Sequence, residues 1–377
     1  MDGGGAPRLA VCANVFPGDR ADQVADALAG PWAAFIDAVG AGARPDFGLY
    51  LGREGAEAVA AAGPAREAVE AARARVEARI WTANAFPIGG FHGEQVKREA
   101  FRPSWDRPER LAYTLAAASA LCALATEPKA APLSLSTCPL GHGADPFDEE
   151  AAVAHLRRFA SWCQELEARE GILLRLALEP EPDGRFEEVG VLANWLATHF
   201  DAAERRYLGV CWDICHGEVV GESPTELLAR CRRLEVVIAK VQVSAALTVA
   251  DASDPRARGR LAALARDPYL HQVRGRGVDG RALAFPDLQP ALDAPVEAAQ
   301  WTVHCHVPVH AGVLGDGLGA SPWREALLAA RDAGIRDFEL ETYTLPILPE
   351  EMRPEGLVGT MAAEWAAVRA ALDLTSS

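Results

Sequence analysis

The sequence predicts a parallel α/β barrel in which eight strands alternate with helices. Short apolar runs and helix-forming segments alternate along most of the 377 residues. Several of the apolar runs also end on residues that can hold a metal or move a proton, namely Glu179, Asp213 with His216, Gln242, His304 with His306, and Glu341. A parallel barrel gathers the carboxyl ends of its strands around one pocket. These distant residues are therefore expected to form a single polar cluster.

The N-terminal part alternates strand and helix. Residues 8–16 form an apolar run whose end is marked by Asn14, Pro17 and Gly18, and 26–45 carry apolar residues at helical spacing. The next strand is expected at 46–52. The alanine-rich segment 53–79 is strongly helix-forming, and Pro64 is expected to break it. The third strand is expected at 78–87.

A long loop, residues 86–110, separates the third strand from the helix expected at 111–125. Loops of this length between a strand and a helix lie on the active-site side of a barrel. Its aromatic residues exceed what a solvated connector needs, so they are expected to wall the pocket, with His92 facing the interior; they are Phe86, Phe91, Phe101 and Trp105.

The alternation continues through the middle of the chain. Strand four is expected at 131–141, and the helix after it should begin at Asp148 as N-cap and end before Gly171. The remaining elements follow in order: a strand at 173–180, a helix at 189–200, a strand at 208–214, a helix at 225–234 and a strand at 236–244.

The alternation breaks between about 245 and 299, a segment rich in Asp, Arg, Pro and Gly. It resumes with a helix at 321–334 and a strand at 337–344. Counting HCHVPV at 304–309 gives nine strands, one more than a closed barrel needs. That run is either a continuation of the strand-seven layer or an added strand near the mouth. The prediction is one domain over 1–377, with the barrel at 8–349, an insertion after strand seven at 245–299, and a C-terminal helix and tail at 350–377.

Composition limits the function classes. The formal net charge of −16 argues against a nucleic acid or an anionic membrane surface as partner, because both attract a basic face. No segment approaches 18 uninterrupted apolar residues, and the N-terminus lacks an export pattern, so neither membrane insertion nor secretion is indicated. Most of the eight cysteines lie in or beside apolar runs, which favours reduced thiols in a cytoplasmic protein.

The strand-end carboxylates predict a metal centre. A carboxylate that ends an apolar strand is costly unless something pairs with it, and a divalent cation is the obvious partner of Glu179 and Glu341. Asp213 and His216 add an oxygen and a nitrogen ligand, and His306 adds another nitrogen. This donor set suits Mn²⁺, Mg²⁺, Co²⁺ or Zn²⁺. Taken singly, Glu179 is as consistent with a solvated loop, and His304 or His306 with a hydrogen-bonded core histidine.

Several motifs together resemble a known family. The segments NAFPIGGFHGEQVKREAFRPSWDRPERLAYT, LSLSTCPLGH, ALEPEP, DICH, KVQVSAAL, HCHVPVH and LETYTLPILPE are similar to those of EboE-type metabolite traffic proteins, over about residues 14–349. That family belongs to the xylose isomerase-like TIM barrels, which include sugar epimerases and endonuclease IV-type DNA repair enzymes. The FPxGGFHG loop is specific, whereas D-x-x-H alone would not be.

The resemblance implies roles for individual residues. Glu179, Asp213 and Glu341 would bind one divalent metal together with a histidine on strand seven, and both glutamates would also move protons. His216 would contact substrate. Strand seven offers Gln242 instead of the usual histidine, so either Gln242 coordinates more weakly or His306 takes over. The candidate substrate-binding residues are His216, Asn84, His92, Gln242 and Trp105.

Three functions are compatible with these residues. The first is a metal-dependent isomerase or epimerase acting on a small polyhydroxylated metabolite, in which Glu179 and Glu341 move a proton between carbons. The second is a non-catalytic protein that binds or channels a metabolite in an Ebo-type traffic pathway, in association with pathway proteins that include a membrane prenyltransferase. A DNA repair role is disfavoured by the acidic charge.

Overall fold

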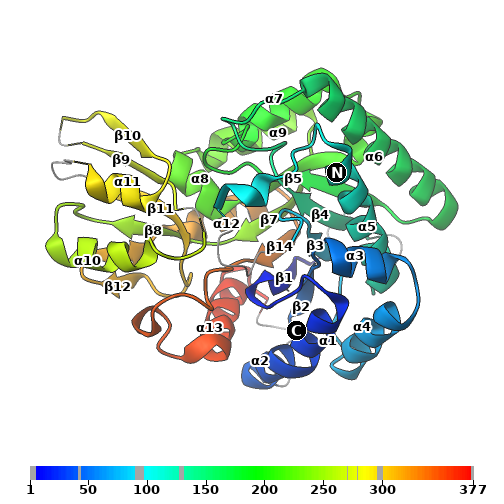
Figure 1. Cartoon of the computed structure of the whole chain (residues 1–377), viewed down its shortest axis with the longest axis horizontal. Coiled ribbons are helices and arrows are strands. Elements are labelled where there is room, and N and C mark those ends of the chain that lie inside the picture. The colour runs from blue at the N-terminus through cyan, green and yellow to red at the C-terminus, as the bar shows by residue number, and fades with distance from the viewer. Residues whose placement is uncertain are drawn as a thin grey trace.

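The structure, a computed structural model, describes residues 6–40, 44–89, 97–126, 131–269, 271–277, 279–294 and 300–374. Within these ranges, eight parallel strands close into a barrel in the order β1-β14-β7-β6-β5-β4-β3-β2, and helices surround it (Figure 1). The barrel closes where β1 pairs with β14, with Arg8 opposite Asp337 and Val11 opposite Leu340. The predicted fold class is confirmed.

The barrel strands lie in the eight segments that the apolar runs predicted. They are β1 (Arg8–Cys12), β2 (Asp46–Tyr50), β3 (Thr82–Asn84), β4 (Leu133–Thr137), β5 (Leu174–Leu178), β6 (Leu208–Asp213), β7 (Ile238–Val243) and β14 (Asp337–Leu340). Each is shorter than the run that predicted it, because the last apolar residues of several runs turn into loops at the carboxyl edge of the barrel. The polar residues after those runs therefore come to the same edge.

Helices cover the outside of the barrel (Figure 1). They are α1 (Ala21–Ala27), α2 (Ala33–Val39), α3 (Arg53–Ala60), α4 (Pro64–Arg75), α5 (Pro108–Leu124), α6 (Glu149–Glu170), α7 (Val189–His199), α8 (Ile214–Val220), α9 (Pro224–Leu234), α12 (Trp323–Asp332) and α13 (Gly356–Ala371). The predicted break at Pro64 is confirmed, since α3 ends at Ala60 and α4 begins at Pro64. The predicted ends of α6 are confirmed too: the Asp148 carboxylate accepts a hydrogen bond from Ala151 N, and Gly171 is left-handed at φ 71°.

A second, antiparallel sheet follows β7 and projects to one side of the barrel (Figure 1). Its strands are β8 (Ala246–Val249), β9 (Val273–Arg276), β10 (Ala282–Phe285), β11 (Trp301–His306), β12 (Val313–Gly315) and β13 (Leu318–Ala320), and its helices are α10 (Pro255–Leu264) and α11 (Leu288–Asp293). Of the two alternatives for HCHVPV, the structure shows the added strand, because β11 pairs with β8 and β9. Three strands of this sheet, β11, β12 and β13, lie beyond residue 299.

The interior of the barrel contains a buried ion pair beneath the carboxyl edge. Lys240 on β7 bonds to Glu339 on β14, and both side chains are fully buried. The Lys240 ammonium also donates to Thr82 Oγ1 at 3.2 Å and to the carbonyl oxygen of Ala83 at 3.3 Å. Gly48 on β2 leaves the space that the Glu339 carboxylate occupies, because a Cβ there would collide with it. The interior of the barrel below its carboxyl edge is thus polar and charged.

Candidate metal centre

Three carboxylates converge at the carboxyl edge of the barrel. Glu179 directly follows β5, Asp213 is the last residue of β6, and Glu341 directly follows β14. One carboxylate oxygen from each lies within 4.8 Å of the other two, and the three residues are at most 4% exposed. The strands thus bring together residues that are up to 162 positions apart in the sequence, as a parallel barrel does.

Asp213 is held in place by a local helix cap. Its Oδ1 accepts hydrogen bonds from His216 N at 2.9 Å and from Ser244 Oγ at 2.8 Å. Its Oδ2 is buried and has no hydrogen-bond partner among the described residues, and it lies 4.0 Å from His306 Nε2. The D-x-x-H motif is therefore an N-cap of α8 that leaves one carboxylate oxygen directed at the cluster.

Glu341 is clamped by two asparagines, one in the 3-10 turn after β1 and one at the end of β3. Its Oε1 accepts from Asn14 Nδ2 at 2.6 Å and from Asn84 Nδ2 at 3.2 Å. Asn84 is itself fixed, because its Oδ1 accepts from Phe86 N at 2.9 Å. Asn14 was expected only to mark the end of the first strand. The rule that identified the other site residues, a polar residue at the end of an apolar strand, applies to it equally.

Hydrogen bonds fix the tautomers of two histidines in the cluster. His306 Nδ1 lies 2.9 Å from the carbonyl oxygen of Glu341, and His216 Nδ1 lies 2.9 Å from that of Pro180. A carbonyl oxygen only accepts, so each Nδ1 carries the proton and each Nε2 presents a lone pair. Metal-binding histidines are commonly oriented in this way. His306 and His216 are thus prepared to accept a cation or a substrate hydroxyl.

Crowding of buried acids raises carboxyl pKa values in the cluster. Burial, reinforced by the charges of Glu341 and Asp213, raises the pKa of Glu179 well above its ordinary value. Burial and the charge of Asp213 do the same to the pKa of Glu341. Burial also acts to raise the pKa of Asp213, but His216, His306 and the hydrogen bonds to its carboxylate together lower it. A divalent cation would remove the repulsion, so the donor set fits a metal ion.

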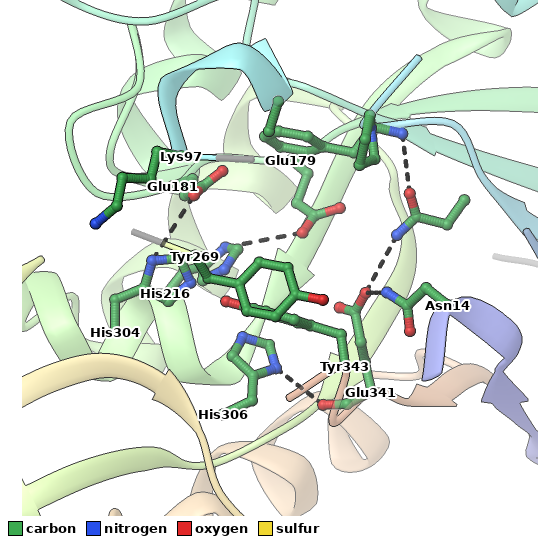
Figure 2. Close-up of a pocket in the computed structure, with 14 residues that line it drawn as sticks. Asn14, Lys97, Glu179, Glu181, His216, Tyr269, His304, His306, Glu341 and Tyr343 are labelled. Atoms are coloured by element: carbon green, nitrogen blue, oxygen red, sulfur yellow. Dashed lines mark hydrogen bonds and ion pairs between the residues drawn. The ribbon is translucent and has the colours of Figure 1, made fainter. Parts of the chain in front are cut away.

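A cavity opens over the carboxylates (Figure 2). The residues that line it are Asn14, Asn84, Phe86, Pro87, Lys97, Ala100, Glu179, Glu181, His216, Tyr269, His304, His306, Glu341 and Tyr343. Tyr343 packs against His306 and Tyr269, with ring centroids 4.6 and 4.9 Å apart. The cavity thus has a carboxylate and histidine floor and partly aromatic walls, which suits a small polar ligand.

Of the predicted substrate-binding residues that the structure describes, some line the cavity and others do not. Asn84 and His216 line the cavity. Gln242 is fully buried, and its Oε1 accepts from Cys211 Sγ at 3.0 Å, whereas Trp105 is fully buried and is absent from the described lining. His92 lies outside the described residues.

The aromatic residues of the loop 86–110 also differ in whether they line the cavity. Phe86 lines the cavity, and Phe101 packs edge-on against it with ring centroids 5.4 Å apart. Phe91 lies outside the described residues. The sequence analysis did not single out Lys97, Glu181, Tyr269 or Tyr343, and it placed His304 in the expected polar cluster without assigning it as a metal ligand. Tyr343 follows Glu341 by two positions, so its place beyond the same strand end was the available signal.

Comparison with known proteins supports the fold. No family model and no curated protein matches the chain. A xylose isomerase-like TIM barrel protein from Mycobacterium smegmatis, solved in complex with magnesium, is 15% identical with a TM-score of 0.52, and the match covers 97% of this chain and 98% of that one. D-allulose 3-epimerase from Methylomonas sp. is 13% identical, with coverage of 99% and 98% and a TM-score of 0.49. An L-ribulose 3-epimerase is 12% identical, with coverage of 99% of each chain and a TM-score of 0.45.

These similarities concern the fold, and the narrower likeness to EboE-type proteins rests on sequence motifs alone. Among the residues that the structure describes, no helix is long and apolar enough to cross a membrane. The eight cysteines all lie in the described part of the chain and none is in a disulfide. The chain folds as a xylose isomerase-like TIM barrel that carries a buried cluster of side chains able to hold a metal ion.

Proposed function

We propose that the protein is a metal-dependent isomerase or epimerase of a small polyhydroxylated, sugar-like metabolite. The observation that carries the proposal is the cluster of Glu179, Asp213 and Glu341, of which Glu179 and Glu341 line the cavity. Three buried carboxylates side by side are costly without a cation. Two of them are glutamates, and a carboxylate is a residue type that accepts and returns protons in general acid–base catalysis.

The three carboxylates would hold one divalent ion. His306 Nε2, at 4.0 Å from Asp213 Oδ2, is an imidazole nitrogen close to that position, and the sequence predicted it as the fourth ligand. The donor set suits Mn²⁺, Mg²⁺, Zn²⁺ or Co²⁺. Magnesium was bound in the structurally similar protein from Mycobacterium smegmatis.

Glu179 and Glu341 would move the proton between substrate carbons. The ion would polarise the carbonyl group of a hydroxycarbonyl substrate and make the neighbouring C–H more acidic. Glu179 has a buried Oε2 without a hydrogen-bond partner among the described residues, so it can take that proton. Glu341, clamped by Asn14 and Asn84, is placed to return a proton to the other carbon or face.

His216 would orient the substrate. Its Nδ1–H is engaged by the carbonyl oxygen of Pro180, so Nε2 accepts a hydrogen bond from a substrate hydroxyl. Tyr269, Tyr343 and Phe86 line the same cavity, and their rings would exclude water from the reacting carbons.

A second candidate function is binding or channelling without catalysis, in an Ebo-type metabolite traffic pathway. The observation that favours it is Gln242, which stands where the sequence resemblance expects a histidine and is hydrogen-bonded to Cys211 rather than exposed to the cavity. Association with a membrane prenyltransferase is part of this proposal. Identifying the genes beside this one would test the pathway.

Hydrogen exchange distinguishes the two functions. Metal-loaded protein is incubated with a ketose such as D-fructose in D₂O, and isotope incorporation is followed by NMR. A catalyst labels the carbon next to the carbonyl group, and Glu179→Gln abolishes labelling because an amide cannot accept the proton. Glu181→Gln serves as the matched control, since Glu181 lines the cavity but lies outside the three-carboxylate cluster. A panel of ketoses that bind and remain unlabelled would establish the binding function instead.

A further inference from the structure

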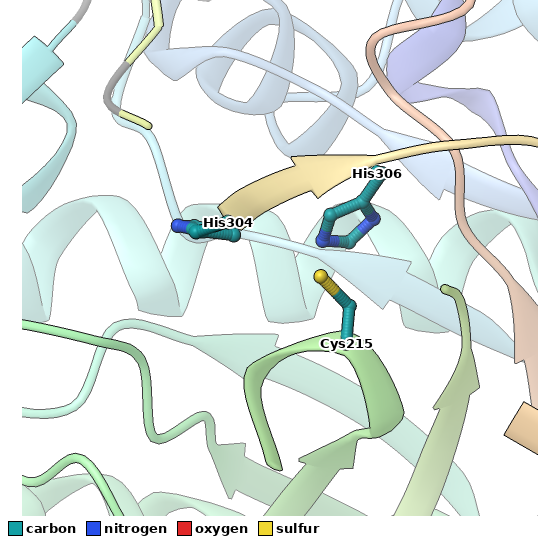
Figure 3. A group of neighbouring side chains, drawn as sticks. All are labelled: Cys215, His304 and His306. Carbon is teal, nitrogen blue, oxygen red and sulfur yellow. The ribbon is translucent and has the colours of Figure 1, made fainter. Parts of the chain in front are cut away.

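We propose that Cys215, His304 and His306 form a second metal site, suited to Zn²⁺, beside the carboxylate cluster. The three side chains face one another across the junction between α8 and β11 (Figure 3). A thiol with two imidazoles is a donor set that zinc favours, and it leaves a fourth position for water or a ligand. The inference goes beyond the proposed function, because it concerns a different ion held by different donors.

The distances permit coordination after a small adjustment. One donor atom from each of the three residues lies within 4.8 Å of the other two. Around a tetrahedral zinc with bonds of about 2.0 to 2.3 Å, neighbouring donor atoms are about 3.3 to 3.6 Å apart. The donors must therefore close by no more than about 1.5 Å, which side-chain torsions can supply.

The hydrogen-bonding of both imidazoles leaves the correct nitrogen available. His304 Nδ1 lies 2.7 Å from Gln272 Oε1, and His306 Nδ1 lies 2.9 Å from the carbonyl oxygen of Glu341. Each Nδ1 therefore carries the proton. Both Nε2 atoms are buried and have no hydrogen-bond partner within the described ranges. A buried nitrogen lone pair without a partner is costly, and a bound cation would remove that cost.

A second layer of contacts orients His304 for this purpose. Gln272, fully buried, uses its amide nitrogen to donate to the carbonyl oxygen of Pro182 at 2.9 Å. That bond fixes which end of the Gln272 amide faces His304, so its oxygen accepts from Nδ1. Supporting hydrogen bonds of this kind are typical of metal-binding histidines.

The site joins two parts of the fold. Cys215 lies in the first turn of α8, at the carboxyl edge of the barrel, whereas His304 and His306 belong to β11 of the second sheet. Strand β11 packs on α8. A metal held by all three residues would therefore fasten the second sheet to the barrel beside the substrate cavity.

The two sites differ in the ions they prefer. Carboxylate oxygens suit Mg²⁺ and Mn²⁺, whereas thiolate and imidazole suit Zn²⁺ and Co²⁺. One imidazole nitrogen binds one ion, so this assignment gives His306 to the second ion. The first ion is then held by Glu179, Asp213 and Glu341.

Optical titration of the metal-depleted, full-length protein with Co²⁺ tests the proposal. Thiolate coordination to Co²⁺ gives a near-ultraviolet charge-transfer band that carboxylates do not produce. The expected result is two bound equivalents and this band. Cys215→Ser and His304→Gln should each abolish the band and remove one equivalent, while Glu341→Gln should keep the band and lose the other equivalent. Gln272→Leu should weaken the thiolate site about 10- to 100-fold, as loss of a supporting contact does.

Cys305→Ser is the matched control, because Cys305 is buried between the two histidines on β11 but lies outside the cluster. It should leave the band unchanged, and circular dichroism confirms that each variant is folded. Absence of the band in the wild type, or its survival in both Cys215→Ser and His304→Gln, overturns the second site. If one equivalent then remains and Glu341→Gln removes it, the carboxylate site of the proposed function still stands.

Discussion

The buried environment of a single residue can change its pKa. Glu364 on α13, which is not one of the proposed metal ligands, is an example. Its Oε1 accepts from Val309 N at 3.0 Å and Thr342 Oγ1 at 2.8 Å, while its buried Oε2 has no partner among the described residues. Burial raises the pKa of Glu364 to about 7, against the lowering effect of those two bonds. The native state therefore holds this proton more tightly than the unfolded chain.

The consequence is a pH-dependent stability. Because the folded pKa is the higher one, the stabilisation is present below about pH 4.5 and is lost as the pH rises through about 7. We expect Glu364→Gln to be more stable than the wild type by about 1 to 3 kcal/mol at pH 8, and equal to it near pH 4. Urea unfolding at several pH values measures this. If Glu364→Gln were more stable than the wild type by the same amount at every pH, the raised pKa of Glu364 would be contradicted.

Asn14 gives a second expectation at the residue scale. Asn14→Ala removes the 2.6 Å bond to Glu341 Oε1 and leaves Asn84 as the remaining clamp shown for that oxygen. We expect metal affinity to fall about 10- to 100-fold, as it does when the support of a ligand is lost. Calorimetric titration with Mn²⁺ measures the affinity. Asn194→Ala, at an exposed position on α7, is the control and should bind as the wild type does.

At the scale of elements, strands β7 and β14 are joined inside the barrel by the Lys240–Glu339 ion pair. A buried ion pair depends on both partners, because removal of one leaves an uncompensated charge. We expect Lys240→Met to cost about 3 to 5 kcal/mol of folding free energy. The double variant Lys240→Met, Glu339→Leu should recover much of that loss. Chemical denaturation of both proteins measures the difference, and equal losses in the two would show that the charge is not the cause.

Some features of the helices and strands could be predicted from neighbouring residues, and others could not. The ends of α6 and the break at Pro64 could be predicted from the residues next to them, because a cap and a proline act within one helical turn. The place of HCHVPV did not follow, since its apolar run suits either sheet. Pairing with β8 and β9 decided it, and those strands are separated from it by up to about sixty residues.

For the whole molecule, metal binding should contribute to stability. A ligand that binds the folded state alone stabilises it by about 2.7 kcal/mol at one hundred times its dissociation constant. We therefore expect chelator-treated protein to melt at a lower temperature than protein with added Mn²⁺ or Mg²⁺. Glu341→Gln should show a much smaller metal-induced shift, and Glu181→Gln a normal one. Equal melting temperatures for wild type with and without each ion would argue against a metal centre.

The sequence by itself determined the barrel and the carboxylates at its strand ends, because strand ends and caps are written in neighbouring residues and parallel strands share one edge. Tertiary structure alone decided what each polar residue faces. Asn14 meets Glu341 across 327 positions of sequence, Gln242 turns to Cys211, and His304 joins the cavity from the second sheet. Side-chain alternation fixes two faces for every strand, but the residue opposite depends on the register between strands that are distant in the chain.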